Sequence, residues 1–164
     1  YQERIFELYN QVVHNQQVRL GYLSAEYLPM LKQALEKSFK VWGFFEGEEM
    51  VAFYSAWLFN STLDMYYIGF DYKSNRKYNL YFNMLFFGVQ TAIERSCKTL
   101  IMGRTAIEAK ARLGCEPRYL STFIFIKNPL IRRWINTMSP NPNGEEWENR
   151  HPFQEKKEQA ERQN

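Results

Sequence analysis

Two stretches, YYIGFDYKSNRKYNLYF (residues 66–82) and LIMGRTAIEAKARLGCEP (residues 100–117), decide the fold that the sequence predicts. The first predicts a strand that ends at a basic loop and continues into a long helix. The second predicts a short buried strand followed by a tightly capped helix. We expect the basic loop and the second helix to direct positive charge and free backbone N–H groups toward one end of a sheet. That arrangement suits an anionic ligand.

Length and composition are those of one globular domain. The chain has 164 residues, of which 45% are hydrophobic and 24% are charged, so it can build a core without disulfides or metals. A net charge of +3 without a Lys/Arg stripe argues against nucleic acid as a partner. Two cysteines in no metal or redox spacing favour a cytoplasmic location, and neither histidine has a ligand pattern, so the sequence predicts no metal site.

The periodicity of apolar residues predicts a mixed α/β fold with helices on both faces of a sheet. The expected sheet is an antiparallel meander of three strands, to which a short strand adds in parallel through a helical crossover. Residues 1–138 then form one domain, and residues 139–164 form a polar tail with little to bury. In chain order we expect helices at 2–14 and 24–37, strands at 39–45, 50–59 and 62–70, a helix at 76–96, a strand at 100–102, a capped helix after 105, a strand at 119–126 and a helix at 129–138.

The helix after the short strand has predicted boundaries at both ends. Thr105 and Glu108 have the spacing of a capping box, in which a hydroxyl and a carboxylate satisfy two N–H groups at the helix start. Gly114 supplies the left-handed residue that ends the helix. For the second helix of the chain, at 24–37, Ser24 is the predicted N-cap and Pro29 disturbs the first turns.

Lys73, Arg76 and Lys77 lie at the start of the predicted long helix, where the helix dipole makes cations unfavourable. A bound phosphate or carboxylate would reverse that cost. The alternative is a solvated basic loop beside Asp71. Asp71 itself could act as a general base or form a salt bridge with Arg76.

Arg104 follows the short strand and opens the capped helix, and Lys110 lies further along that helix. These two cations suit the binding of an anion, or the stabilisation of developing negative charge, near a strand exit. The alternative pairs Arg104 with Glu108 and leaves Lys110 in solvent. Cys115 has no accompanying His, so we expect a small buried residue rather than a nucleophile.

Two further features have both a functional and a structural interpretation. Tyr66, Tyr67 and Tyr72 could donate a proton to a leaving group, but aromatic residues of a sheet more often belong to its core. The helix that carries Arg132–Trp134 could touch a membrane surface, and the sequence favours its docking on the domain instead.

The order helix–helix–three-strand meander–long helix–strand–short helix–strand resembles the GNAT acyltransferase fold without its first strand. The stretch TAIEAKARLGCEP (residues 105–117) is similar to the region after that fold's fifth strand, where a short helix ends in a Leu-Gly pair. Together with YIGFDYKSNRKYNLYFN (residues 67–83), it resembles the GNAT-related BioF-like or Fem-like acyltransferases. In those proteins a Lys occupies this helix and two modules can stand in tandem. The resemblance covers about residues 1–127.

This resemblance implies an N-acyltransferase that transfers an acyl or aminoacyl group to the amine of a small molecule or peptide. Acetyl-CoA or another acyl-CoA would be the donor, with its amide arm held by the backbone of the strand end and its phosphates held by residues 73–78. Arg104 and Lys110 would stabilise negative charge, and Asp71 would be the base. The donor-binding residues are then Ile68, Gly69, Phe70, Tyr72, Lys73, Asn75, Arg76, Lys77 and Tyr78.

The chain departs from the family pattern at two places. The glycine-containing pyrophosphate loop of acetyl-CoA enzymes is absent from residues 71–78, and Lys110 stands where many acetyltransferases have a Tyr. With the apolar side of Leu80–Phe87, these departures motivate an alternative, a catalytically silent module that binds a partner or completes another module's site. The missing first strand, and a helical pattern that already includes Tyr1, lead us to expect a second GNAT-type module upstream or a homodimer.

Overall fold

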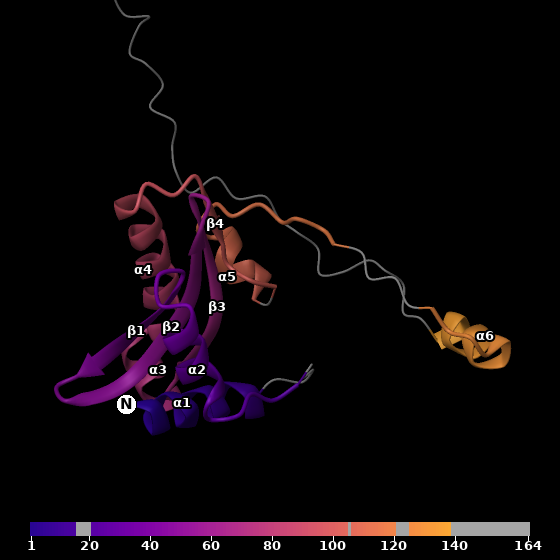
Figure 1. Cartoon of the computed structure of the whole chain (residues 1–164), viewed down its shortest axis with the longest axis horizontal. Helices are drawn as coiled ribbons and strands as arrows, with labels where there is room; N and C mark the ends of the chain where they lie inside the picture. The colour runs from indigo at the N-terminus through magenta and orange to yellow at the C-terminus, as the bar shows by residue number, and fades with distance from the viewer. Residues whose placement is uncertain (16–20, 105, 121–124, 139–164) are drawn as a thin grey trace, which may run out of the picture. The chain divides into compact units, whose positions relative to one another are not determined.

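The computed structural model describes residues 1–15, 21–104, 106–120 and 125–138 (Figure 1). The chain divides into two units, residues 1–104 and residues 105–164. This division lies before the single boundary that the sequence predicts after residue 138. The tail that would follow that boundary lies outside the described residues.

The first unit is built on a four-stranded mixed sheet in the order β1-β2-β3-β4. The first three strands pair antiparallel, and β4 pairs parallel to β3. The predicted α/β class, the meander and the parallel crossover are therefore confirmed. The strands are β1 Phe39–Glu46, β2 Glu49–Phe59, β3 Thr62–Phe70 and β4 Thr99–Ile101.

The helices described in the first unit pack on this sheet or follow its third strand (Figure 1). α1 has the bounds that its apolar period predicts. α2 is shorter than predicted, and its N-cap is Glu26 rather than Ser24. Pro29 is the third residue of α2, where a missing N–H costs no intrahelical bond. These helices are α1 Gln2–His14, α2 Tyr27–Ala34, α3 Tyr72–Tyr78 and α4 Leu80–Glu94.

The single long helix predicted for residues 76–96 is wrong, because the chain forms two helices there. Asn79 has φ 50° and ψ 43°, which ends α3 and starts α4 in a new direction. Asn is among the few residues that enter this left-handed region at low cost. α3 begins directly after Asp71, so Arg76 and Lys77 lie in its last turn rather than at the start of a long helix.

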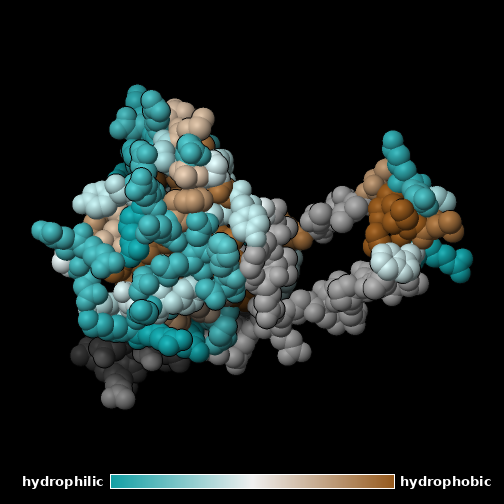
Figure 2. Space-filling model, turned by 90° about the horizontal axis from the view of Figure 1, so that it is seen from below, coloured by the Kyte–Doolittle hydropathy of each residue, from teal (hydrophilic) through white to brown (hydrophobic). Residues whose placement is uncertain are grey.

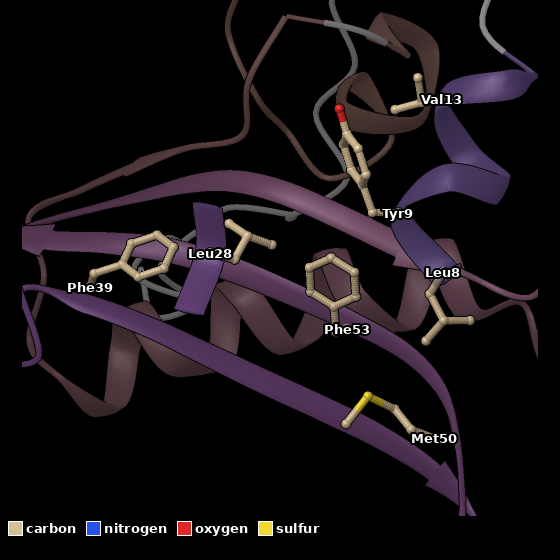
Figure 3. Packing of buried hydrophobic residues seen from close by; sticks show 7 residues of the cluster. All are labelled: Leu8, Tyr9, Val13, Leu28, Phe39, Met50 and Phe53. Atoms are coloured by element: carbon tan, nitrogen blue, oxygen red, sulfur yellow. The ribbon is translucent and has the colours of Figure 1, made fainter. Parts of the chain in front are cut away.

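A cluster of buried apolar side chains joins α1 and α2 to β1 and β2 (Figure 3). Leu8, Phe39 and Phe53 in this cluster are fully buried. Burial of such large side chains is the main stabilising term in a domain of this size. The cluster consists of Leu8, Tyr9, Val13, Leu28, Phe39, Met50 and Phe53.

α1 approaches β3 so closely that only a glycine fits between them. A Cβ on Gly69 would lie 2.5 Å from the backbone nitrogen of Tyr9 and 2.6 Å from the backbone carbon of Leu8. It would also lie 2.4 Å from the ring of Phe53. The helix backbone cannot yield as a flexible side chain would, so Gly69 fixes the distance between α1 and the sheet.

α4 packs on the sheet through a second close approach. A Cβ on Gly88 would lie 2.7 Å from the sulfur of Met65 in β3. On the outer side of α4, Phe86 and Ile93 are 55% and 72% exposed. Within Leu80–Phe87 itself, Phe86 is the one exposed apolar residue, whereas Leu80, Met84 and Leu85 are buried, so the apolar outer side is narrower than the sequence predicts.

The second unit contains α5 Ile107–Ala111 and α6 Pro129–Met138 among its described residues. The predicted end of α5 is confirmed: Gly114 has φ 73°, and the N–H groups of Gly114 and Cys115 donate to the carbonyls of Ala111 and Lys110. Thr105 of the predicted capping box lies outside the described residues. α5 has Ala106 as its N-cap, without a side-chain cap bond, so the helix starts later than predicted.

The predicted strand at 119–126 falls partly on residues 121–124, which lie outside the described residues. On either side, residues 119–120 and 125–126 form no strand. The predicted helix that starts at Pro129 is confirmed as α6. Its first turn is capped by Asn128, whose side-chain oxygen accepts the backbone N–H of Leu130 at 2.9 Å.

We expect Gly69→Ala to lower the free energy of unfolding by about 3 kcal/mol, because the added methyl group forces α1 away from β3. Chemical unfolding in urea, followed by circular dichroism, measures the change. Gly21→Ala is the matched control: its Cβ meets nothing within 4 Å, so we expect a change within about 0.5 kcal/mol. Equal stability of the two variants would contradict the close packing of α1 on β3.

Candidate functional site

The candidate site lies where β3 continues beyond its parallel neighbour. β4 pairs with β3 over only three residues, from Thr62 opposite Thr99 to Asp64 opposite Ile101. β3 then runs on to Phe70 while the chain after β4 turns away at Gly103, which has φ 73°. The edge of β3 from Met65 to Phe70 is therefore not paired by β4.

Backbone groups of two residues point toward this open edge. The N–H of Asp71 donates to the carbonyl of Val51 at 2.9 Å, and Gly69 stands opposite Phe53 in β2. Hydrogen-bonding direction alternates along an antiparallel strand, so Gly69 and Asp71 bond to β2. The N–H and C=O groups of Ile68 and Phe70 consequently point away from β2.

A β-bulge precedes these two residues. Between the pairs Tyr54–Ile68 and Ala56–Met65, β2 has one residue, Ser55, and β3 has two, Tyr66 and Tyr67. The buried hydroxyl of Ser55 fills the gap in the ladder. It accepts the N–H of Tyr67 and donates to the C=O of Tyr67, both at 3.0 Å.

The bulge gathers tyrosines on the face that carries α1 and α2. The rings of Tyr66 and Tyr67 lie 4.4 Å apart, and Tyr9 of α1 meets Tyr67 edge to face at 5.7 Å. The hydroxyls of Tyr27 and Tyr66 lie 3.0 Å apart. Burial, as the largest cause, raises the pKa of both Tyr66 and Tyr67 above the ordinary value. These phenols are thus neutral hydrogen-bond donors at physiological pH.

Arg104 brings a positive charge to the same edge. It is exposed and follows β4 directly after the left-handed Gly103. Its charge acts on Tyr67, where it opposes the effect of burial on the pKa of that phenol. Arg104 thus follows the end of β4, and its effect on Tyr67 is visible only in the structure.

Asp71 has a structural role that the sequence does not predict. Its carboxylate accepts the backbone N–H of Ser74 at 2.8 Å and so caps α3. This hydrogen bond is the largest influence on its pKa, which is lowered despite partial burial. A carboxylate that is occupied and weakly basic is a poor general base, which argues against the predicted catalytic role.

The basic segment also differs from the predicted phosphate site. In the last turn of α3, Arg76 and Lys77 are favoured by the helix dipole, so no bound anion is needed to offset their charge. Lys77 and Tyr78 both bind the carboxylate of Glu46 at the end of β1, Lys77 at 2.8 Å. This pairing raises the pKa of Lys77.

Other predicted donor-binding residues also have structural partners. The side-chain oxygen of Asn75 accepts the backbone N–H of Tyr81 at 2.9 Å and thereby caps the start of α4. Tyr72 packs its ring 5.0 Å from that of Phe70. Gly69 is held against the backbone of α1. Lys73 is exposed on the first turn of α3.

Two predicted residues belong to the second unit. Lys110 is only 7% exposed, which is contrary to the solvated alternative considered from the sequence. Burial lowers the pKa of Lys110 and raises the pKa of Cys115, and the two groups moderate each other's shift. Cys115 is half-buried rather than fully buried, and its raised pKa is unfavourable for a nucleophile. Glu108 forms a salt bridge with Arg112 at 3.2 Å.

Two crystal structures of mutant forms of the BH1408 protein from Bacillus halodurans are similar to this chain in fold. The tetramutant matches with a TM-score of 0.54 and 10% identity, over 76% of this chain and 93% of its own. The second mutant matches with a TM-score of 0.54 and 11% identity, over 76% and 92%. At this identity the likeness shows the fold alone. No protein-family model matches the chain, and no curated protein sequence matches it either.

We expect Asp71→Ala to cost about 1 kcal/mol of unfolding free energy at neutral pH, because α3 loses its N-cap. The pKa of Asp71 is lower in the folded state, so its contribution is complete above the ordinary carboxyl pKa of about 4 and is lost as the pH falls through the folded value. Urea unfolding of both proteins from neutral to acidic pH tests this: the difference should shrink on acidification. Glu26→Ala is the control, because Glu26 precedes α2 without a cap bond. A difference that grew at low pH would exclude the cap.

Proposed function

We propose that this chain is an N-acyltransferase domain of the GNAT type, which transfers an acyl or aminoacyl group to an amine. The observation that carries the proposal is the open edge of β3, at which Ile68 and Phe70 present backbone donors and acceptors. The exposed Arg104 adds a positive charge that acts on Tyr67 of the same strand. The fold shared with BH1408 supports only the architecture. The sequence resemblance supplies the reaction class, which the experiments below test.

An acyl-CoA suits this edge because its arm is a chain with two amide groups. Such an arm can add to the edge as a further strand would, donating to and accepting from Ile68 and Phe70. Recognition of this kind relies on backbone hydrogen bonds and tolerates different acyl groups. It also explains how a donor could bind although residues 71–78 contain no glycine loop.

The transfer step needs stabilisation of negative charge at one oxygen. When the amine attacks the thioester carbonyl, a C–N bond forms and the carbonyl oxygen becomes negative. The C–S bond then breaks, and the proton lost by the amine goes to the sulfur, directly or through a water. Arg104 and the neutral hydroxyls of Tyr66 and Tyr67 are the groups at the β3 edge that can stabilise this oxygen. The acceptor is the amine of a small molecule or peptide.

The proposal also includes a charge-stabilising role for Lys110 and a cytoplasmic compartment for the reaction. The resemblance gives Lys110 a charge-stabilising role, whereas burial favours its neutral form. The cysteine spacing favours a reducing, cytoplasmic compartment. No metal is part of the proposed reaction.

A specific observation favours a second candidate, a catalytically silent module of the same fold. Asn75, Lys77 and Tyr78, which the resemblance assigns to the donor's phosphates, are engaged in contacts that hold α3, α4 and β1. A module without a phosphate site could bind a partner through the outer side of α4. This candidate predicts an intact fold without turnover.

We expect the protein to bind acetyl-CoA, a longer acyl-CoA or CoA in isothermal titration, and to acylate amines with the acyl forms.

Arg104→Gln should lower kcat/KM by about a hundredfold, because a charge at the reacting oxygen is lost. The control is Arg95→Gln, an exposed arginine after α4, which should leave kcat/KM unchanged. Binding without turnover supports the silent module. No binding by any of the three ligands removes the CoA version.

We expect Ile68→Pro to weaken donor binding about tenfold, because it removes an N–H that points to the open edge and leaves the ladder to β2 intact. Titration with CoA measures the dissociation constant, and a thermal melt shows that the variant is folded. An unchanged constant in the folded variant would show that the donor does not add to the edge of β3.

A further inference from the structure

α6 presents one apolar and one basic side. The apolar residues of its first two turns are exposed to different degrees. Figure 2 shows brown, hydrophobic atoms gathered on this helix beside teal, hydrophilic ones. Arg132 and Arg133 are also exposed. The exposed fractions are 77% for Leu130, 48% for Ile131, 62% for Trp134 and 40% for Ile135.

Helix geometry separates the two kinds of side chain. At 3.6 residues per turn, positions 130, 131, 134 and 135 fall on one arc, and positions 132 and 133 fall on the other. A helix of ten residues is marginal in water when it stands alone. Contact along the apolar arc is therefore what would stabilise α6.

The charge around α6 indicates what makes that contact. From residue 117 to residue 144 the sequence contains four cations and no Asp or Glu. Two of the four, Arg132 and Arg133, lie on the helix itself. Lys127 lies two residues before the first helical residue, next to the capping Asn128. Such a segment is complementary to a surface that is anionic outside and apolar beneath.

We propose that α6 lies in the interface of an anionic lipid membrane. Its apolar arc enters the boundary between headgroups and acyl chains, and Arg132 and Arg133 contact the lipid phosphates. With ten residues α6 is too short to span a bilayer, so it would lie on the surface. None of the described helices is long and apolar enough to cross a membrane. A membrane contact of α6 is the alternative to its docking on the domain, which the sequence favours. It does not depend on the proposed acyl transfer.

Co-sedimentation with lipid vesicles tests the proposal on the full chain. We expect binding to vesicles of phosphatidylcholine with phosphatidylglycerol, and much weaker binding to phosphatidylcholine alone. Binding should fall as salt is raised. Arg132→Gln and Arg133→Gln should each weaken binding about fivefold, and Ile131→Ser should weaken it about tenfold.

Matched variants control for charge and apolarity in general. Arg112→Gln, directly after α5, and Met30→Ser, on α2, change an exposed arginine and an exposed apolar residue outside α6 and should leave vesicle binding unchanged. Circular dichroism shows that each variant is folded. Equal binding to neutral and anionic vesicles, no binding to either, or wild-type binding by both α6 arginine variants would overturn the proposal. A concentration-dependent dimer that Ile131→Ser abolishes in sedimentation velocity would identify a second copy as the occupant instead.

Discussion

The hydrogen bonds between Ser55 and Tyr67 hold the feature on which the candidate site depends. An extra residue in β3 would otherwise leave a gap in the ladder, and the serine hydroxyl fills that gap by both accepting and donating. A bulged strand bends and twists more strongly than a regular one. The bulge begins two residues after Asp64, the last residue that β4 pairs. Its bend therefore acts where the two parallel strands part.

The same bulge determines which side chains meet. With two residues opposite one, Tyr66 and Tyr67 both contact aromatic residues of the α1 and α2 face. After the bulge the alternation resumes, which directs Gly69 at α1 and the backbone groups of Ile68 and Phe70 at the open edge. The approach of α1 to Gly69 and the direction of the backbone groups of Ile68 and Phe70 thus both depend on the register that the bulge sets.

The sequence predicts the parts of this fold that depend on long apolar periods and strong turn residues. The meander, α1, α6 and the Gly114 cap belong to this group. The sequence does not predict the break at Asn79, because apolar side chains stand on both sides of it, from Tyr78 to Tyr81, and no Gly or Pro marks it. Asp71, three residues before Ser74, is the available signal for a helix start. The bulge has no comparable signal, because Tyr-Tyr in a strand fits a regular register equally well.

The break at Asn79 changes the electrostatic environment of Arg76 and Lys77 more than it changes the fold. As the start of one long helix, Arg76 and Lys77 would lie against the dipole and would gain from a bound anion; in the last turn of α3 they gain from the helix itself. Lys77 is further satisfied by Glu46. What remains for an anionic donor is Arg104 and the exposed Lys73, together with the polar backbone of β3. If the proposed acyl transfer holds, recognition of the donor would rest on strand-like hydrogen bonding more than on charge, and the enzyme would select its donor by the amide arm before the phosphates.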